Sequence, residues 1–209
     1  MNTEKALKIV LDFKSDSLIN KLNQLKSETI GKTKKELTDN IPLYNAALLV
    51  KKASSQINEI VHAVGILNSL PRILEENEII TDLSLASGAS GEGIDLVTDK
   101  RVAEFKFATW QEGGSKNGMR KRQVFADYIN LTILETNKKK ELYVVSSESI
   151  KKYFQGKSKW KKVLSKSGGL DMKYAEFLKQ KGIKETEYIR DIYSRSEIEI
   201  FDIEQILND

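Results

Sequence analysis

The chain has 209 residues, of which 40% are hydrophobic, and 34 basic residues against 30 acidic ones give a net charge of +4. This length suits one globular domain with a small appendage and a well-buried core. The absence of cysteine excludes disulfides, thiol catalysis and cysteine-ligated zinc. No run approaches the roughly 20 apolar residues of a membrane span, and the N-terminus lacks the apolar core of a secretory signal. We therefore expect a cytoplasmic protein without a membrane partner, whose mild basicity permits nucleic-acid binding without requiring it.

The first part of the chain is predicted to be helical. Apolar residues recur at helical spacing in residues 3–40, which indicates two helices. A long helix is expected over residues 43–70, with Pro71 closing it. We predict an N-terminal helical segment at residues 1–40 and a second domain at residues 41–209.

The second domain alternates between strand and helix patterns. Short runs rich in apolar residues predict strands at 78–85, 94–98, 101–107, 141–146 and 197–201. A helix is expected at 117–136, and the C-terminal part at 147–209 is expected to be mostly helical. This order predicts an α/β fold with a mixed β-sheet flanked by helices, together with extra N-terminal helices.

Two of these strands form a predicted hairpin that turns at Asp99-Lys100. The residue numbers of cross-strand partners then add to 199, so Asp95 faces Glu104 on the same side of the sheet. Lys106 lies two residues beyond Glu104 and shares that side. The opposite side is expected to be core and carries Ile94, Leu96, Ala103, Phe105 and Phe107.

The three charged residues of the hairpin indicate a metal site. Two directly opposed carboxylates repel each other unless a cation lies between them, and oxygen ligands of this kind suit Mg²⁺ or Mn²⁺. A cation held by Asp95, Glu104 and the Phe105 backbone carbonyl could polarise a phosphoryl oxygen. Lys106 could orient the attacking water or stabilise negative charge. The alternative is a solvated sheet face with a cross-strand salt bridge.

At this point the sequence resembles the PD-(D/E)xK, or restriction-endonuclease-like, nuclease superfamily. The resemblance lies in Gly93-Ile94-Asp95-Leu96-Val97 and Val102-Ala103-Glu104-Phe105-Lys106-Phe107, within a core motif region at residues 45–146. Ile94 stands where the superfamily pattern has proline. The resemblance implies a restriction-endonuclease-like core in which Asp95 and Glu104 bind Mg²⁺ and Lys106 serves the attacking water.

The helix before the first core strand supplies two further candidates. Members of the superfamily often carry an acidic residue there, and Glu59 fits as a catalytic residue that binds a second metal or a metal-bound water. The alternative is an exposed helical glutamate. His62, which is the only histidine, lies one turn later and is expected to be a structural hydrogen-bonding residue, with contact to substrate or metal as the alternative.

Two groups of cations are candidates for binding nucleic acid. The first, at the start of the helix over 117–136, comprises Lys116, Arg120, Lys121 and Arg122. Cations at a helix N-terminus oppose the helix dipole, a mismatch that a docked phosphate would explain. Gln123 joins them because some superfamily nucleases use a glutamine and a tyrosine on this helix, although Tyr128 follows at a spacing of five rather than four.

The second group, Lys159, Lys161 and Lys162, belongs to a basic run interleaved with Tyr153, Phe154 and Trp160. Cations with aromatic residues can follow a phosphate backbone and stack on bases. Alternatively the aromatic residues are core positions of an amphipathic helix, which we favour for them but not for the lysines.

These features together predict a Mg²⁺-dependent endonuclease that hydrolyses DNA phosphodiester bonds. A homodimeric type II-like restriction endonuclease is the leading subtype, because two active sites are needed to cut both strands. A repair or junction-resolving nuclease and a non-specific defence nuclease are alternatives. A rival from another class is a catalytically inactive DNA-binding protein on a nuclease scaffold.

Overall fold

The structure is a computed structural model in which the chain divides into two compact units, Met1–Asn58 and Glu59–Asp209. It describes all residues except 15–16, 38, 86–93, 109–116 and 209. The predicted boundary at residue 40 falls inside the first unit.

The first unit is helical, as the sequence predicts. It contains α1 (Thr3–Lys14), α2 (Leu18–Thr29), the short 3-10 helix η1 (Lys34–Glu36) and α3 (Ile41–Ala53). The side chains of Ser17 and Asn40 cap α2 and α3 by accepting backbone N–H groups of the first helical turn. Helix α1 packs along α3.

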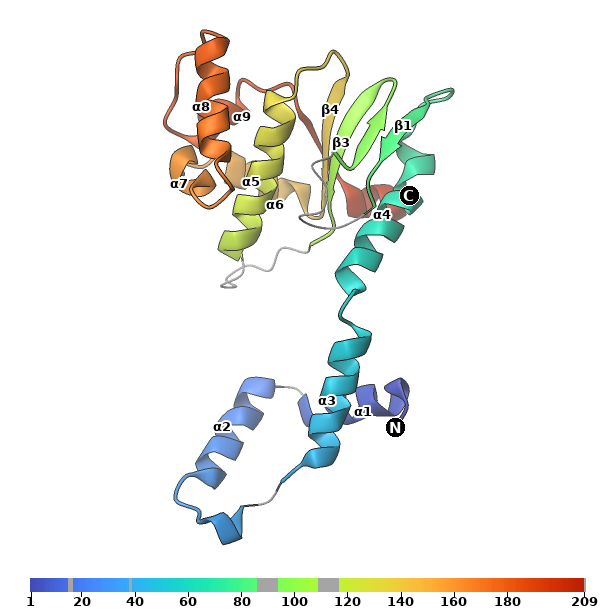
Figure 1. Ribbon diagram of the computed structural model, residues 1–209, viewed down its shortest axis with the longest axis vertical. Coiled ribbons are helices and arrows are strands. Elements are labelled where there is room, and N and C mark those ends of the chain that lie inside the picture. The colour runs from blue at the N-terminus through green and yellow to red at the C-terminus, as the bar shows by residue number, and fades with distance from the viewer. Residues whose placement is uncertain (15–16, 38, 86–93, 109–116, 209) are drawn as a thin grey trace. The chain divides into compact units, whose positions relative to one another are not determined.

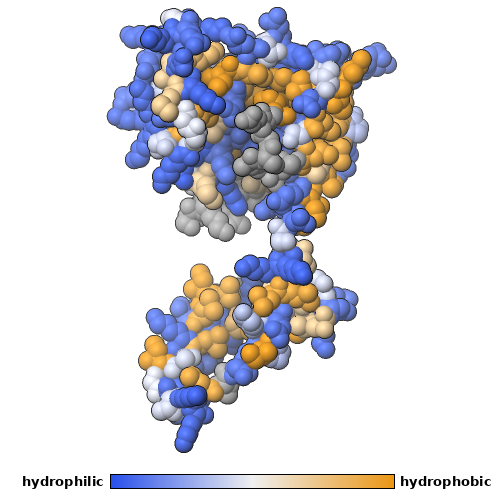
Figure 2. All heavy atoms as spheres, in the orientation of Figure 1, coloured by the Kyte–Doolittle hydropathy of each residue, from blue (hydrophilic) through white to orange (hydrophobic). Residues whose placement is uncertain are grey.

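This unit has little buried apolar surface of its own. Within its described residues only Ala6 and Ala46 are buried. The apolar stripe of α2 is exposed to solvent, since Leu18, Ile19 and Leu22 are 39%, 72% and 50% exposed. Apolar side chains are also visible on the surface of the unit (Figure 2). A contiguous exposed apolar surface is typical of an interaction site.

The single helix predicted over residues 43–70 is wrong, because two helices occupy that region. Helix α3 ends at Ala53, and α4 (Ile57–Ile73) begins after a short turn. The hydroxyl groups of Ser54 and Ser55 donate to backbone carbonyls of the preceding turn, and such local bonds compete with helix continuation. Helix α4 also continues through Pro71, which lies near its end and removes a single backbone donor there.

A five-stranded mixed sheet forms the centre of the second unit, as predicted (Figure 1). Its strands lie in the order β1 (Ile80–Leu83), β2 (Leu96–Thr98), β3 (Arg101–Lys106), β4 (Lys139–Val144) and β5 (Glu199–Asp202). Strand β2 is antiparallel to both of its neighbours, β1 and β3, whereas β3, β4 and β5 are parallel. The carboxyl ends of β3 and β4 therefore meet at one edge of the sheet.

Helices cover both faces of this sheet (Figure 1). They are α5 (Asn117–Ile133), α6 (Ser147–Phe154), α7 (Trp160–Leu164), α8 (Leu170–Gln180) and α9 (Ile189–Tyr193) on one face, and α4 and α10 (Ile203–Asn208) on the other. The core under α5 includes Val102, Leu142 and Val144, and the core under α4 includes Ala103 and Phe105. None of the described helices combines the length and apolar character needed to cross a bilayer.

The register of the β2–β3 hairpin agrees with the prediction. Leu96 pairs with Ala103 and Val97 pairs with Val102, so the partner numbers add to 199. One expected core position is wrong, because Ile94 packs against the core under α5 rather than with Leu96. Since β2 begins at Leu96, the alternation of faces does not extend back to Ile94.

A buried ion-pair network fixes the opposite end of β3. The guanidinium of Arg101 donates to both carboxylate oxygens of Glu78 at 2.7 Å and to Glu141 at 2.9 Å. Burial would raise the pKa of Glu78, but hydrogen bonds from Arg101 and Thr98 prevail and lower it to about 2. This network ties the segment before β1 to β3 and β4.

Candidate active site

The centre of the candidate site lies on β3. Glu104 and Lys106 alternate with the core residue Phe105, so their side chains point to the face covered by α5. Asp95 comes just before β2 and directly precedes Leu96, which pairs with Ala103. Its Oδ2 atom accepts the backbone N–H of Phe105 at 2.8 Å. The predicted convergence of Asp95, Glu104 and Lys106 is thus confirmed, whereas their catalytic role stays a prediction.

Asp95 and Glu104 form a buried pair of carboxyl groups. They are 7% and 6% exposed, and they lie close enough for the charge of Asp95 to raise the pKa of Glu104. Nζ of Lys106 lies 3.7 Å from Oε2 of Glu104. Two carboxyl groups so close together need a shared proton or a cation between them.

Burial, followed by the negative charges of Asp95 and Asp127, raises the pKa of Glu104 to about 9, although Lys106 acts in the opposite direction. In the absence of a metal ion the carboxyl group of Glu104 therefore holds its proton more tightly than a free glutamate does. A divalent cation is the natural replacement for that proton, because metal ions bind carboxylates in their ionised form. This observation fits a metal site at the pair.

Asp127 on α5 is a member of the cluster that the sequence analysis missed. Its Oδ2 atom lies 3.3 Å from Nζ of Lys106. Burial raises the pKa of Asp127, and Lys106 opposes the shift. An acid between the core positions Val124 and Tyr128 was the available signal, because buried helix positions rarely carry an unpaired carboxylate.

The amine of Lys106 is held charged by its neighbours. Burial alone would lower the pKa of Lys106, but the carboxylates of Asp127, Glu104 and Asp95 together raise it. The side chain is 30% exposed. Lys106 can therefore present a positive charge beside the acidic pair.

His62 reaches the site from α4. Its Nε2 atom lies 3.4 Å from Oδ1 of Asp95 without forming a hydrogen bond, and it is buried. The rings of His62 and Phe107 pack in a T-shaped arrangement with the centroids 5.9 Å apart. Gly65 makes room for that ring, because a Cβ atom there would lie 2.4 Å from Cε1 of Phe107. The expected hydrogen bond of His62 is not formed among the described residues, and its nitrogen points at the acidic pair instead.

The remaining predicted metal ligands are less well supported by their positions. Glu59 is exposed on the first turn of α4. Over the described ranges of the chain, no three histidine or acidic side chains are grouped closely enough to hold a metal ion. A cation would therefore be held chiefly by Asp95 and Glu104, and the roles of Glu59 and of the Phe105 carbonyl stay predictions.

The first group of predicted DNA-binding residues lies on α5. Arg120, Lys121 and Arg122 are half-buried and follow the first turn of the helix. Nζ of Lys121 lies 5.2 Å from the ring centre of Tyr153. Gln123 is exposed whereas Tyr128 is buried in the core, so the two do not form a pair on one helix face. Lys116 lies outside the described residues.

The second group is partly occupied by local ion pairs. Lys159 pairs with Glu187, and Lys161 pairs with Glu185 at 2.7 Å, whereas Lys162 is exposed. Trp160 is 1% exposed and its indole N–H donates to the Thr186 carbonyl at 2.6 Å. Trp160 and Phe154 are therefore core residues, as the alternative interpretation predicted, and DNA contact by the lysines stays a prediction.

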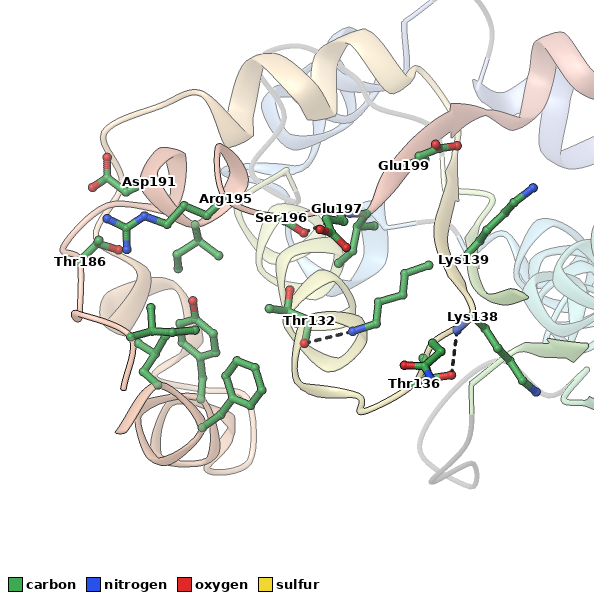
Figure 3. A pocket seen from close by; sticks show the side chains of 18 of the residues that line it. Thr132, Thr136, Lys138, Lys139, Thr186, Asp191, Arg195, Ser196, Glu197 and Glu199 are labelled. Carbon is green, nitrogen blue, oxygen red and sulfur yellow. Dashed lines mark hydrogen bonds between the residues drawn. The ribbon is translucent and has the colours of Figure 1, made fainter. Parts of the chain in front are cut away.

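A cavity of about 800 Å³ lies at the other edge of the sheet (Figure 3). Lys139 and Glu199, which begin β4 and β5, line it together with Thr132 and Arg195. Lys106 ends β3 at the opposite edge, so this cavity is separate from the acidic pair. The candidate site is thus identified by its charged groups rather than by this cavity.

In comparisons with known proteins, no family model, no curated protein and no solved structure matches this chain. The functional inference therefore depends on the buried carboxyl pair, on Lys106 and on the side chains that surround them.

Proposed function

We propose that this chain is a Mg²⁺-dependent endonuclease that hydrolyses DNA phosphodiester bonds. In this proposal Asp95 and Glu104 hold the cation, for which Mn²⁺ is an alternative, and Lys106 lies beside the scissile phosphate. The observation that carries the proposal is the buried pair of Asp95 and Glu104, with the amine of Lys106 3.7 Å from Oε2 of Glu104. The five-stranded mixed sheet is compatible with a restriction-endonuclease-like core.

Each residue would have a separate task. A bound divalent cation would polarise the phosphoryl group and make water a better nucleophile. Lys106 would donate hydrogen bonds to a phosphate oxygen or to the attacking water and so stabilise the developing negative charge. Asp95 is suited to a fixed position because its other contacts, to Phe105 and His62, orient its carboxylate.

The cations of α5 support a nucleic-acid substrate. Arg120, Lys121 and Arg122 lie on the same helix as Asp127, which contacts Lys106. Side chains of this type bind phosphate groups without reading sequence. In this proposal the α5 cations bind the DNA backbone, and the same helix contacts the partly exposed Lys106 through Asp127.

The finer proposal is a type II-like restriction endonuclease acting as a homodimer. Cutting both strands at one position needs two active sites. The exposed apolar residues of the first unit offer a surface for self-association. Light scattering of the full chain and of a version lacking residues 1–40 tests this, and a monomeric full-length protein would contradict the dimer.

Cleavage of supercoiled plasmid in Mg²⁺ and in EDTA tests the main proposal. The unmodified protein should cleave only with the metal, and Asp95→Asn, Glu104→Gln and Lys106→Ala should each reduce the rate at least about 100-fold. Glu148→Gln is the control, since it removes an acid that is exposed on α6. If Asp95→Asn cleaves as fast as the unmodified protein, the nuclease proposal is wrong.

The alternatives give different results in the same assay. A catalytically inactive DNA-binding protein would retard DNA in a gel without cutting it in Mg²⁺. A junction-resolving or repair enzyme would prefer branched DNA to linear duplex, and a non-specific nuclease would degrade plasmid without discrete fragments. Discrete fragments with uniform ends would favour the restriction-like subtype.

A further inference from the structure

Helix α5 brings a single acid to the amine of Lys106. Asp127 is the one acidic residue in the sequence of α5. Its side chain is 19% exposed, and Oδ2 is buried without a hydrogen bond while it lies 3.3 Å from Nζ of Lys106. Burial of a carboxylate at this position is unfavourable unless a cation pairs with it.

The amine lies between carboxylates that come from different elements. Glu104 on β3 approaches Nζ of Lys106 at 3.7 Å, and Asp127 on α5 approaches it at 3.3 Å. A lysine side chain has four rotatable bonds and loses rotamer entropy when it is fixed. Glu104 is next but one in the same strand, so within the described part of the chain Asp127 is the ion-pair partner that reaches the amine from outside β3.

The support behind Asp127 is rigid. Its helical neighbours Val124 and Tyr128 are 4% and 0% exposed and belong to the core under α5. A carboxylate on such a helix has a fixed position, unlike one on a surface loop. This arrangement is typical of groups that orient a reactive side chain.

We propose that Asp127 is a positioning residue that holds the amine of Lys106 beside Glu104. Its role as an aid to cleavage depends on the proposed nuclease function, whereas the contact itself does not. Asp127 acts through Lys106 and does not itself bind the phosphate. A role as a third metal ligand is disfavoured, since the described acidic and histidine residues form no metal-binding group of three.

The first experiment needs no activity. The metal-free protein is treated briefly with acetic anhydride, and the acetylation of each lysine is measured by mass spectrometry. Asp127→Asn should raise the acetylation rate of Lys106 at least about threefold, because the freed amine becomes mobile. Asp127→Glu should leave it within a factor of about two, since a carboxylate remains to pair with the amine.

A surface ion pair supplies the matched control. Oε1 of Glu148 lies 3.3 Å from Nζ of Lys151, the same distance as in the buried pair, but the Glu148 side chain is 88% exposed. Glu148→Gln should therefore change neither the reactivity of Lys106 nor cleavage. Circular dichroism of each variant shows whether the fold is retained.

The second experiment measures single-turnover cleavage of DNA under saturating protein. Asp127→Asn should slow cleavage by about 10-fold to 100-fold, with DNA affinity in Ca²⁺ unchanged within about twofold. Asp127→Glu should restore part of the rate. In Lys106→Ala, the further change Asp127→Asn should have no effect, because the group that Asp127 positions is already gone.

The outcomes separate this inference from the proposed function. If Lys106 acetylation is unchanged in Asp127→Asn, or if the two substitutions slow cleavage additively, the positioning role is wrong. If acetylation rises as expected but the unmodified protein cleaves no DNA, the contact stands and the nuclease function fails.

Discussion

Nε2 of His62 lies 3.4 Å from Oδ1 of Asp95, while Oδ2 of Asp95 accepts the backbone N–H of Phe105 at 2.8 Å. Asp95 is therefore contacted by two elements, helix α4 through His62 and strand β3 through the backbone of Phe105. Lys106 is held in a similar way by β3 and α5. Both helical layers thus contribute to the orientation of one small cluster.

His62 is expected to support metal binding without being a primary ligand. His62→Ala should weaken the affinity for Mn²⁺ about 10-fold, because Asp95 loses the group that orients its free oxygen. Isothermal titration calorimetry with Mn²⁺ measures this change directly. Val64→Ala is a suitable control, since Val64 is 47% exposed on the same helix. Unchanged Mn²⁺ affinity in His62→Ala would show that the contact has no role in the site.

The raised pKa of Glu104, from 4.5 to about 9, predicts an unusual pH dependence of stability. The folded protein binds this proton more tightly than the unfolded chain does. The contribution of this proton to the stability of the folded protein is therefore complete below about pH 4.5. It is lost as the pH rises towards 9. In EDTA the free energy of unfolding should fall with pH across that range, with a slope of at most about 1.4 kcal/mol per pH unit.

Urea denaturation at several pH values measures this slope. Glu104→Gln should flatten it, because glutamine is neutral at every pH tested. Saturating Mg²⁺ should also flatten it, because the cation binds the ionised carboxylate and replaces the proton. A slope that is the same with and without Glu104 would contradict the prediction.

The Arg101 network predicts a large loss of stability when one partner is removed. Arg101→Met should cost about 3–5 kcal/mol of unfolding free energy, because Glu78 and Glu141 would remain buried without a cation. The triple variant with Glu78→Gln and Glu141→Gln should recover part of that loss. Urea denaturation at pH 7 measures both values, and a triple variant less stable than Arg101→Met would contradict the explanation.

Gly65 should be intolerant of a side chain, although it lies inside a helix. Gly65→Ala places a Cβ atom 2.4 Å from the Phe107 ring, and the displaced ring packs against His62. We expect a loss of about 1–3 kcal/mol of unfolding free energy. Gly118→Ala on α5 is the control, since nothing lies within 4 Å of its added Cβ atom and alanine favours helix. Equal stability of the two variants would contradict the steric argument.

The hairpin was the part of the fold most completely predictable from the sequence. Two strand patterns separated by a two-residue turn leave one register, and a register determines which side chains face one another. Asp95, Glu104 and Lys106 could therefore be brought together without a structure. The mixed sheet followed from the order of the patterns.

Contacts between distant elements could not be predicted in this way. Nothing in the spacing of α5 places Asp127 against Lys106, because helix-to-sheet packing depends on all the side chains of both elements. His62 against Asp95 is a contact of the same kind. The break between α3 and α4 was missed because the apolar period continues through Ser54 and Ser55, whose side chains bond to the backbone instead.

The chain passes from one compact unit to the other at Asn58, inside the first turn of α4, and His62 follows about one turn later. A fragment cut at that boundary would leave the histidine close to a free end, where helices fray and backbone N–H groups lack partners. Truncation of the protein to its second unit would therefore weaken the orientation of Asp95, even though no residue of the acidic pair is removed. A shortened version that begins before Ile41 keeps α3 ahead of that turn and avoids the problem.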